Sequence, residues 1–405
     1  MTFQPPAGGR DLFPLDVAQK SWIRERLQEV CQRWGYQRII TPTLERLETL
    51  VAGGAIHPRA VVTLQDGEGT LGLRPDLTAS IARAAASHLS PWHYPQRFYY
   101  IATVFRPHPR DGHCLEQYQA GVELLGAKGL LADAEVLLLL VDCLEVLGLS
   151  SWQLLLGDAG LTQALLQPFP ASWQPQVRTC LAELDRTGLR RLNLPPALHD
   201  LALRLFDLRG RPAEVLAQLA TWETSPELQT RLRDLENLVG LLPSHLNVVL
   251  DLSLIQTFDY YTGLVFSAVS EGSSPALLGQ GGRYDDLVGI YDPAGRSQPG
   301  IGFSLRMEEI QSWLVKHNHL MQESPPSDWL VVPLAPEAGR PALAHAQHLR
   351  QLHPHLRVEL ELLNQPPATV RAQAQRRRIA QIAWVTAAAE IQTEVLGVDS
   401  APGLS

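Results

Sequence analysis

Side chains able to hold a small charged molecule are concentrated in four short segments of the 405-residue chain. Carboxylates and amide oxygens in these segments suit a bound cation, and an arginine among them suits an anion. Taken one at a time, each has an ordinary structural explanation, Glu123 as a charge at a strand end and the tyrosines as half-buried core residues. The segments are RPDLTA at 74–79, FRPHPRDGHCLEQYQAGVE at 105–123, DLSLIQTFDYYTGLVF at 251–266 and GQGGRYDDL at 279–287.

Three glycines in the last segment, Gly279, Gly281 and Gly282, predict a turn at which backbone approaches a ligand closely. As a nucleotide-binding signature the segment is weak, because no G-x-G-x-x-G opens a helix here. The sequence also lacks the Walker A, H-E-x-x-H and G-x-S-x-G motifs. The glycines therefore indicate a close backbone approach and no particular cofactor.

Two further polar groups have weaker functional interpretations. The pairs His317/His319 and His353/His355 lack companion acids or cysteines, so we expect solvated histidines and no metal site. The basic cluster 371–378 could contact nucleic acid, but no aromatic residues are interleaved with its arginines Arg371, Arg376, Arg377 and Arg378. A solvated helix face is the favoured interpretation for this cluster.

The composition is that of a globular protein with a sizeable core. Hydrophobic residues make up 45% of the chain and charged residues 19%, and the length allows one large and one smaller domain. The formal net charge of −8 and the pI near 5.9 argue mildly against a nucleic-acid partner. The four cysteines form no C-x-x-C pair and the N-terminus has no apolar signal core, so we expect a cytoplasmic protein.

One apolar run, at 130–149, is long enough to resemble a membrane span. It contains Asp133, Glu135, Asp142 and Glu145, which a lipid-facing helix tolerates poorly. We therefore expect a buried amphipathic helix and no membrane partner.

The elements that must position these residues begin with a helix followed by strands. Apolar residues from Ile23 to Trp34 have helical spacing, and Gly35 follows as a helix stop. The segment YQRIITPTLE is a strand interrupted by Pro42, which suits an edge or an interface. Short apolar runs between 60 and 125 predict antiparallel strands, and residues from about 160 to 240 predict an inserted helical region.

The C-terminal part predicts a return to strands and then a second domain. Strand patterns recur at LNVVLDLSL and YYTGLVFSAV, and a helix follows near SLRMEEIQSWLVKH. Two prolines among polar residues predict a linker at 321–328. Beyond it, residues 329–405 alternate as β-α-β-α-β, which favours a small α/β domain. The expected domains are therefore 1–320 and 329–405.

In this order the four segments and their elements resemble the core of histidyl-tRNA synthetase, strongly over 10–125 and 245–312 and weakly elsewhere. The resemblance implies an α+β fold with a class II aminoacyl-tRNA synthetase-like antiparallel sheet core flanked by helices. The first helix, strand and proline resemble class II motif 1, which lies at a dimer interface. The small α/β domain weakly resembles the anticodon-binding domain of these enzymes.

By the same resemblance, two of the three arginines that serve adenylation are replaced. Adenylation needs fixed cations where charge develops on the phosphates, and loss of one such group costs roughly 100- to 1,000-fold in rate. Arg106 matches the motif 2 arginine and could neutralise a ligand carboxylate, but Gln256 and Glu309 stand where the family has arginine. Gln256 also alters the pocket wall, Glu309 would repel a triphosphate, and the motif 2 loop lacks the family's glutamate and arginines. We expect negligible adenylation.

The amino-acid pocket of the family is largely kept. By resemblance, Asp76, Thr78 and Gln119 would hold an α-ammonium group, although Asp76 is one methylene shorter than the synthetase glutamate. Glu123 and Tyr261 would grip an imidazole ring, one as acceptor and one as donor. The expected histidine-binding residues are Asp76, Thr78, Arg106, Gln119, Glu123, Tyr260, Tyr261 and Tyr284.

A kept pocket with lost catalytic charge is similar to the synthetase-like regulatory subunits of ATP phosphoribosyltransferase, the first enzyme of histidine biosynthesis. The resemblance implies a non-catalytic sensor of L-histidine, without cofactor or metal. Its partner would be a short-form catalytic subunit that needs it for activity and for feedback inhibition. A homodimer through the class II core within a hetero-octamer is implied as well. The alternatives are an active histidyl-tRNA synthetase, or another paralogue that binds or modifies a protein.

Overall fold

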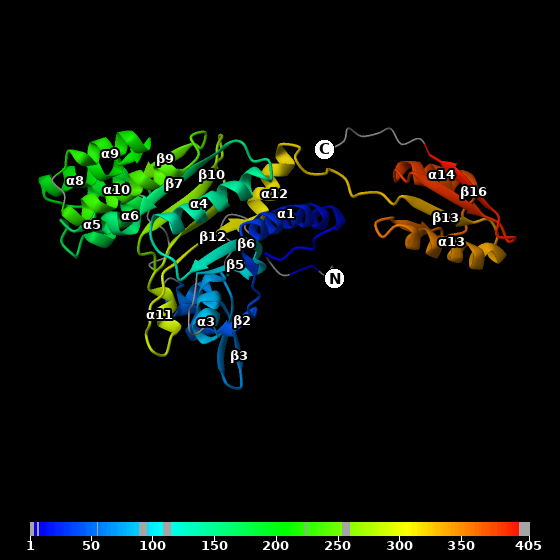
Figure 1. Cartoon of the computed structure of the whole chain (residues 1–405), viewed down its shortest axis with the longest axis horizontal. Coiled ribbons are helices and arrows are strands. Elements are labelled where there is room, and N and C mark those ends of the chain that lie inside the picture. Colours follow the sequence, from blue (N-terminus) through cyan, green and yellow to red (C-terminus); the bar gives the residue numbers. More distant parts are fainter. Residues whose placement is uncertain are drawn as a thin grey trace. The chain divides into compact units, whose positions relative to one another are not determined.

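The chain divides into two compact units, Met1–Gln322 and Glu323–Ser405, which are drawn in Figure 1. Each unit has hydrophobic clusters built from its own residues alone. The boundary falls in the proline-containing segment 321–328. The computed structural model describes residues 4–5, 8–54, 56–88, 95–107, 115–222, 225–252 and 260–396.

A large mixed sheet organises the first unit. Its neighbours pair antiparallel except for two parallel pairs, β1 with β5 and β7 with β9. The expected α+β class is confirmed, and the two parallel pairs lie toward opposite ends of a mainly antiparallel core. Within the described residues the nine strands are, in spatial order, β1 (Gln37–Arg38), β5 (Gln96–Phe105), β6 (Glu116–Leu125), β12 (Gly300–Arg306), β11 (Leu277–Arg283), β10 (Leu264–Ser270), β7 (Trp152–Asp158), β9 (Val248–Asp251) and β8 (Arg209–Gly210).

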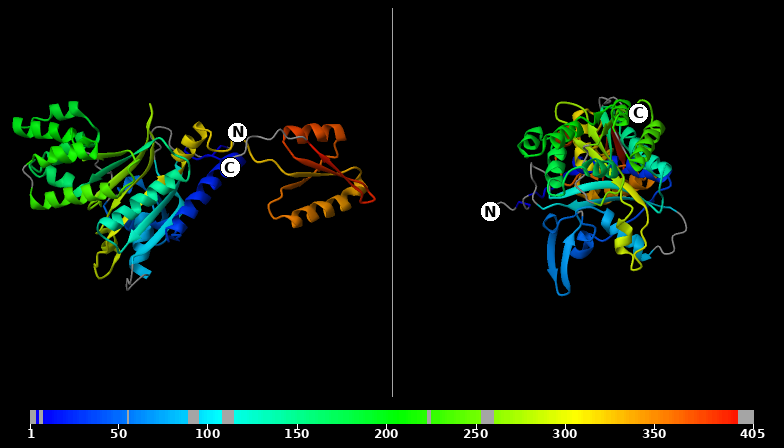
Figure 2. Two further views of the ribbon diagram at one scale, coloured as in Figure 1. Left: turned by 45° about the horizontal axis from the view of Figure 1, so that its top comes forward. Right: turned by 90° about the vertical axis from the view of Figure 1, so that its left-hand side faces the viewer.

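Three helices cover one face of this sheet, as Figures 1 and 2 show. In the first of them Ile23, Leu27 and Val30 are buried, because residues three or four apart lie on one side of a helix. The helix ends at Trp34, and Gly35 has a φ of +79°, a conformation that glycine adopts without steric cost. The predicted helix and its stop are confirmed. The three helices are α1 (Pro14–Arg33), α4 (Leu130–Glu145) and α12 (Met307–Lys316).

The apolar run at 130–149 forms the buried helix α4, as predicted. Each of its four acids contacts a side chain of another element; the half-buried Asp133 and Glu135 pair with arginines, and Asp142 and Glu145 are exposed, so no acid is buried without a partner. Among the described residues, no helix combines the length and apolar character needed to cross a bilayer. The four pairs are Asp133 with Arg283, Glu135 with Arg97, Asp142 with the Trp34 indole N–H, and Glu145 with His245.

The opposite face of the sheet carries shorter elements around a second hydrophobic cluster. The segment around Pro42 is divided between two sheets, since β1 lies at the edge of the large sheet and β2 belongs to a small one. The Arg74 guanidinium donates to the carbonyls of Thr41 (2.8 Å) and Pro42 (3.1 Å) and so fixes the connection. The elements are β2 (Leu44–Arg46), α2 (Leu47–Val51), η1 (Pro58–Ala60), β3 (Val62–Asp66), β4 (Gly69–Leu73), α3 (Thr78–His88) and α11 (Leu287–Tyr291).

The predicted helical insertion runs from β7 to β9 and contributes the short edge strand β8 to the large sheet on the way. Local signals start its helices: the Asp158 carboxylate accepts from the Leu161 N–H (2.7 Å), and the Ser225 hydroxyl accepts from the Leu228 N–H (3.3 Å). The apolar faces of the insertion join the same core as α1 and α4. Its helices are α5 (Ala159–Leu166), α6 (Gln174–Ala182), α7 (Arg186–Arg191), α8 (Pro196–Phe206), α9 (Pro212–Ala220) and α10 (Pro226–Leu241).

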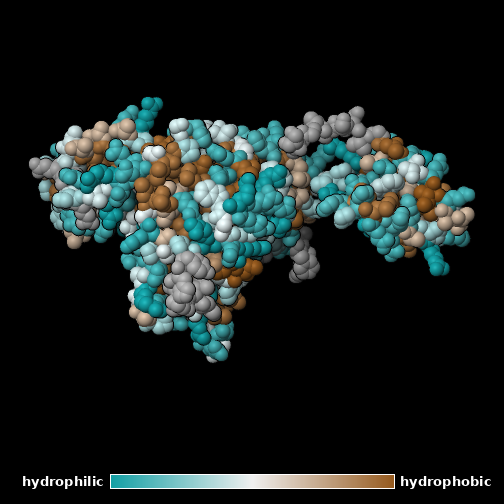
Figure 3. All heavy atoms as spheres, viewed as in Figure 1, coloured by the Kyte–Doolittle hydropathy of each residue, from teal (hydrophilic) through white to brown (hydrophobic). Residues whose placement is uncertain are grey.

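The second unit is a small α/β layer structure with the expected β-α-β-α-β order. Its sheet has the order β14-β13-β15-β16, in which the first three are parallel and β16 is antiparallel. Figure 3 shows apolar groups on its surface, and Leu362 and Leu363 are mostly exposed. The elements are β13 (Trp329–Pro333), η3 (Pro336–Ala338), α13 (Gly339–Leu352), β14 (Val358–Leu360), α14 (Pro367–Arg376), β15 (Gln381–Val385) and β16 (Ile391–Val395).

Candidate functional site

The structure brings all eight predicted site residues together around one cavity in the first unit. The cavity contains about 380 Å³ of empty space, partly open to solvent. Only a small part of this space is wide enough for a water molecule, so an amino acid would require the lining side chains to move apart. The predicted lining residues are Asp76, Thr78, Arg106, Gln119, Glu123, Tyr260, Tyr261 and Tyr284.

Strand register explains why distant residues meet on one face of the sheet. Gln119 and Glu123 are four positions apart in β6, and alternate residues of a strand point to the same side. Glu123 pairs with Gly302 of β12, and Ser304 of β12 pairs with Gln280 of β11. The floor of the cavity is therefore a polar stripe that crosses three neighbouring strands.

Glu123 lies at the centre of the polar contacts and is 1% exposed. Its Oε1 accepts from the Thr78 hydroxyl (2.7 Å), and its Oε2 accepts from the Tyr284 hydroxyl. Burial raises the pKa of Glu123 to about 8, an effect that the hydrogen bonds from Tyr284 and Thr78 oppose and the nearby Asp76 reinforces. Near neutral pH this carboxyl can exchange a proton with a ligand.

Asp76 offers a buried acceptor at the start of α3. Its carboxylate accepts from the backbone N–H groups of Thr78 and Ala79, but its Oδ1 has no partner among the described residues. Burial raises the pKa of Asp76, and the charge of Arg106 and the two backbone donors oppose that rise. A buried oxygen without a donor is costly unless a ligand supplies one, and an ammonium group would do so.

Three phenols form an aromatic wall beside Glu123. Tyr260 packs edge-on against Tyr261, with ring centroids 4.9 Å apart, and against Tyr284 at 5.9 Å. Burial raises the pKa of all three phenols, so their hydroxyls stay protonated and can donate. Edge-to-face packing fixes ring orientation, and hence the direction in which those hydroxyls point.

Glycines in the strands make the space that the site side chains occupy. A Cβ at Gly302 would collide with the Glu123 carboxylate, and one at Gly300 with the Tyr284 ring. A Cβ at Gly282 would lie 2.7 Å from the Tyr261 ring. The prediction of a turn at GQGG is wrong, because Gly279, Gly281 and Gly282 lie inside strand β11. A side chain at these positions would collide with the side chains and backbone atoms that pack over them.

Glu309 stands at the last of the three positions where the histidyl-tRNA synthetases have arginine. Glu309 lies in the first turn of α12 and does not line the cavity. Arg306, three residues earlier, was not predicted; burial and the neighbouring charge of Arg106 lower its pKa, and Glu309 opposes that effect. Neither Arg106 nor Arg306 donates a side-chain hydrogen bond to any other described residue. Gln256 falls outside the residues that the structure describes.

Comparison with known proteins identifies the family. Residues 8–310 match the histidyl-tRNA synthetase family model. The chain is 50% identical to the ATP phosphoribosyltransferase regulatory subunit of Rippkaea orientalis, over 98% of this chain and 100% of that one. It is 51% identical to that of Synechococcus elongatus, over 98% of each chain. The chain belongs to the ATP phosphoribosyltransferase regulatory subunit family.

Solved structures agree with this assignment. An ATP phosphoribosyltransferase regulatory subunit/histidyl-tRNA synthetase from Bacillus halodurans has a TM-score of 0.80 and 29% identity, covering 95% of this chain and 99% of that one. Histidyl-tRNA synthetase from Nostoc sp. PCC 7120 has a TM-score of 0.78 at 20% identity, covering 98% and 97%. The second likeness shows a shared fold alone.

The cavity of this regulatory-subunit family member has further lining residues that the sequence did not predict. The Tyr100 hydroxyl donates to Gln119 Oε1 at 3.5 Å, a weak contact, and its ring fills the space left by Gly121. The strand alternation of QRFYYIATVF was a usable signal for Tyr100, but it does not say which face meets a ligand. Gly281, for which the sequence predicted a close backbone approach to a ligand, also lines the cavity, and the additional lining residues are Tyr100, Gln280, Gly302, Phe303 and Ser304.

The paired histidines and the basic cluster 371–378 do not line this cavity. His317 is exposed but stacks on Trp313, with ring centroids 3.9 Å apart, so it is not simply solvated. Among the described residues, no cluster of three or more His, Cys, Asp or Glu side chains could hold a metal. In the basic cluster, Arg371 pairs with Glu394 and Arg377 pairs with Glu359, which satisfies charges that nucleic acid would otherwise meet.

Proposed function

We propose that this chain is the non-catalytic regulatory subunit of ATP phosphoribosyltransferase in histidine biosynthesis. It would be required both for activity of a short-form catalytic subunit and for feedback inhibition by L-histidine. The observation that carries this proposal is the 50% identity, over essentially both full lengths, to relatives that bear the regulatory-subunit name. The cavity supports it independently, because its groups complement each end of a histidine molecule.

The ammonium group of histidine would meet the acidic end of the cavity. Asp76 Oδ1 is buried and has no donor among the described residues, and Gln119 lies on the same lining. A charged donor and an ionised acceptor make hydrogen bonds about twice as strong as neutral ones. Arg106, whose charge acts on Asp76, would face the ligand carboxylate at the other side of the same α-carbon.

The imidazole ring would lie between Glu123 and Tyr261. One ring nitrogen would donate to the Glu123 carboxylate, and the other would accept from the Tyr261 hydroxyl, which matches a neutral imidazole. Glu123 must be ionised to accept both from the ring and from Thr78 and Tyr284, so ligand binding would draw its proton away. Phenylalanine or asparagine would leave these buried polar groups unsatisfied, which supports selectivity for histidine.

The site is poorly suited to adenylation. Gln256 and Glu309 replace two arginines of the histidyl-tRNA synthetases, and Glu309 places negative charge where a triphosphate would lie. Electrostatic stabilisation of the developing phosphate charge would then lack two of the three arginines that serve it in the synthetases. The chain therefore serves as a sensor in this proposal and has no synthetase activity, cofactor or metal.

The proposed assembly is a cytoplasmic hetero-octamer built on class II-type homodimers. The segment at Pro42, which resembles the class II dimer motif, presents apolar side chains to solvent: Ile40 is 78% exposed and Leu44 is 42% exposed. Burial of such side chains on association is favourable. The C-terminal unit, which resembles an anticodon-binding domain, has no proposed contact with nucleic acid.

Substitutions in the ring-binding part of the cavity test the proposal. In complex with the cognate short-form catalytic subunit, Glu123→Ala and Tyr261→Phe should weaken histidine inhibition by about tenfold or more, while the complex still forms. Tyr36→Phe, a phenol on the opposite face of the sheet, is the matched control and should leave inhibition unchanged. Full inhibition in both site variants would exclude this site, and histidine-dependent exchange of pyrophosphate into ATP would indicate a synthetase instead.

A further inference from the structure

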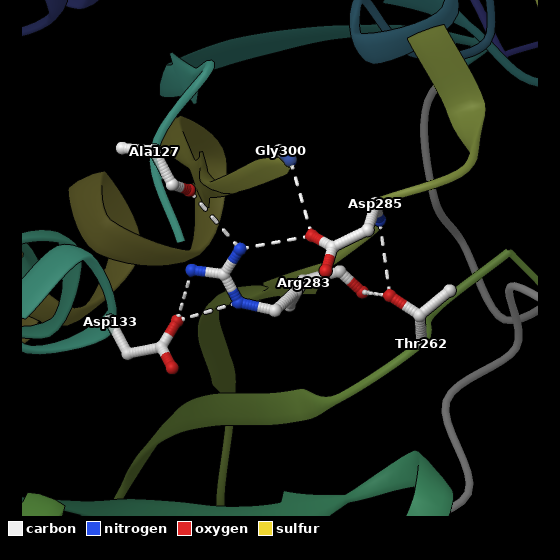
Figure 4. Close-up of polar contacts among 6 residues, drawn as sticks. All are labelled: Ala127, Asp133, Thr262, Arg283, Asp285 and Gly300. Atoms are coloured by element: carbon white, nitrogen blue, oxygen red, sulfur yellow. Dashed lines mark hydrogen bonds and ion pairs between the residues drawn. The ribbon is translucent and has the colours of Figure 1, made fainter. Parts of the chain in front are cut away.

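A largely buried ion-pair network surrounds Arg283, which directly precedes the site residue Tyr284 in the chain (Figure 4). Arg283 is the last residue of β11, and its side chain is 8% exposed. Its Nε and Nη2 both donate to Asp133 Oδ1 of α4, at 2.9 and 2.6 Å. Its Nη1 donates to Asp285 Oδ1 (2.9 Å) and to the Ala127 carbonyl (3.3 Å). None of these residues lines the cavity.

The network continues into the backbone on the cavity side. Asp285 Oδ1 also accepts from the Gly300 N–H (3.3 Å), and the Asp285 N–H donates to the Thr262 hydroxyl (3.0 Å). The Thr262 N–H donates in turn to the Arg283 carbonyl (2.8 Å). Figure 4 shows Asp133, Ala127 and Asp285 around the guanidinium, with Gly300 and Thr262 joined to Asp285.

These contacts hold the residues next to two site tyrosines. Tyr284 lies between Arg283 and Asp285, and its own N–H donates to the Gly300 carbonyl (2.7 Å). Tyr261 is followed directly by Thr262. The backbone on both sides of Tyr284, and on one side of Tyr261, is thereby tied to helix α4 on the far layer of the unit.

We propose that Asp133 and Arg283 are positioning residues that hold the Tyr284 hydroxyl on Glu123. This proposal rests on the proposed function only where it concerns histidine. Neither residue contacts the ligand; each acts through the tyrosines. A hydrogen bond weakens steeply once its donor–hydrogen–acceptor angle falls below about 120°, so a movement of Tyr284 that tilts its hydroxyl would weaken its contact with Glu123.

The direction in which Asp133→Asn shifts the pKa of Glu123 distinguishes a positioning role from a purely electrostatic one. The Tyr284 hydrogen bond lowers the pKa of Glu123, so loosening Tyr284 in Asp133→Asn should raise that pKa further. Removing the negative charge of Asp133 acts through space in the opposite sense, because a more positive surrounding favours ionised Glu123. Positioning therefore predicts an upward shift, and electrostatics alone a downward one.

The decisive experiment is a titration of the Glu123 carboxyl in the full chain without ligand. Infrared difference spectra against Glu123→Gln assign its carbonyl band, and the midpoint is compared between wild type, Asp133→Asn and Tyr284→Phe. We expect both variants to shift the midpoint upward, by about one pH unit for Tyr284→Phe. In the double variant the upward shift of Asp133→Asn should disappear, because the hydrogen bond it acts through is already gone.

Matched variants guard against a general structural effect. Glu135→Gln breaks another ion pair of α4, with Arg97, and should leave the midpoint unchanged even if it lowers the melting temperature. Thr262→Val removes a single arm of the network and provides a milder test should Asp133→Asn fold poorly. An unchanged or lowered midpoint in both Asp133→Asn and Thr262→Val overturns the positioning role.

Histidine binding gives the second readout. By calorimetry at pH 7, Asp133→Asn should bind L-histidine about tenfold more weakly than wild type, while Glu135→Gln binds normally. If wild type binds no histidine but the infrared shifts occur, the proposed effector is wrong and the positioning role stands. If histidine binds equally to wild type and Asp133→Asn, and the midpoint does not move, the positioning role is wrong and the proposed function stands.

Discussion

Glu123 is the residue at which burial, hydrogen bonding and charge oppose one another most directly. Its burial favours the protonated form, whereas the donors Thr78 and Tyr284 favour the ionised form. A ligand that brings a ring N–H into the cavity adds a further donor and tips this balance. In the proposed function the same residue would therefore couple effector binding to proton release, and this coupling would be strongest below a pH of about 8.

Glu123 should also make the stability of the chain depend on pH. Its pKa is raised from 4.5 to about 8 in the folded state, so the folded state binds more protons than the unfolded state between these values. The free energy of unfolding then falls as pH rises through that window, by up to about 1.4 kcal/mol per pH unit. Glu123→Gln cannot ionise and should lack this loss.

Urea unfolding of the two proteins between pH 4.5 and pH 9 measures the effect. The stability advantage of Glu123→Gln should grow from about pH 4.5 and become constant above about pH 8. A pH-independent difference would show that Glu123 titrates normally in the folded chain, contrary to its buried setting.

At the residue scale the sequence predicts most of the site residues, but it does not predict the contacts that surround them. The eight residues were found because their order matches a known pattern, and the structure does gather them around a cavity. Arg306 and Tyr100 carry no such pattern; only the pairing of their strands places them near the site. The unpaired oxygen of Asp76 is likewise a property of packing, which no local sequence records.

At the scale of elements, the cavity depends on strands that have glycine where a site side chain packs against them. Gly302 faces Glu123, and Gly300 faces Tyr284. Sequence reasoning treated the glycines of GQGG as a turn, because glycine is commonest where the backbone bends. In a strand the same residue instead marks a close approach, and the choice between the two requires knowledge of the neighbouring strands.

A methyl group in one of these strands should damage the site. Gly302→Ala would push its Cβ into the Glu123 carboxylate and the Val122 carbonyl, so we expect a loss of about 1–3 kcal/mol in stability and weaker histidine binding. Gly240→Ala in α10 meets nothing within 4 Å and should stabilise the chain by up to about 1 kcal/mol. Thermal unfolding and calorimetry distinguish the two. Normal histidine binding by Gly302→Ala would refute the role of this close approach.

Other elements show where sequence patterns stop being informative. The helices α1 and α4 were predicted correctly because long amphipathic or apolar segments leave little choice. Strand β16 was missed because IQTEV is short, polar and largely exposed. The parallel pairing of β7 with β9 is set by the helical insertion that separates them along the chain, and no local pattern specifies it.

At the scale of the whole molecule, the proposed effector site belongs to the first unit. All eight predicted site residues lie before residue 322, and the hydrophobic clusters around them contain no residue of the second unit. A shortened chain ending at Gln322 should therefore unfold cooperatively and bind histidine within about threefold of the full chain. Loss of binding on shortening, measured by calorimetry, would show that the C-terminal unit contributes to the site.

In the proposed function, binding of histidine and binding of the catalytic subunit must affect each other. If histidine alters the affinity for the catalytic subunit by some factor, the catalytic subunit must alter the affinity for histidine by the same factor. The cavity must also widen to admit an amino acid, since its present free space suits water.

The most direct test is reconstitution with the cognate short-form catalytic subunit. Formation of phosphoribosyl-ATP is measured with and without this chain while L-histidine is titrated. A regulatory subunit should raise the activity of the catalytic subunit, and histidine should then reverse the gain, with the reversal weakened in Glu123→Ala. No activation by a folded wild-type chain, or activation that histidine leaves untouched, would contradict the proposed function.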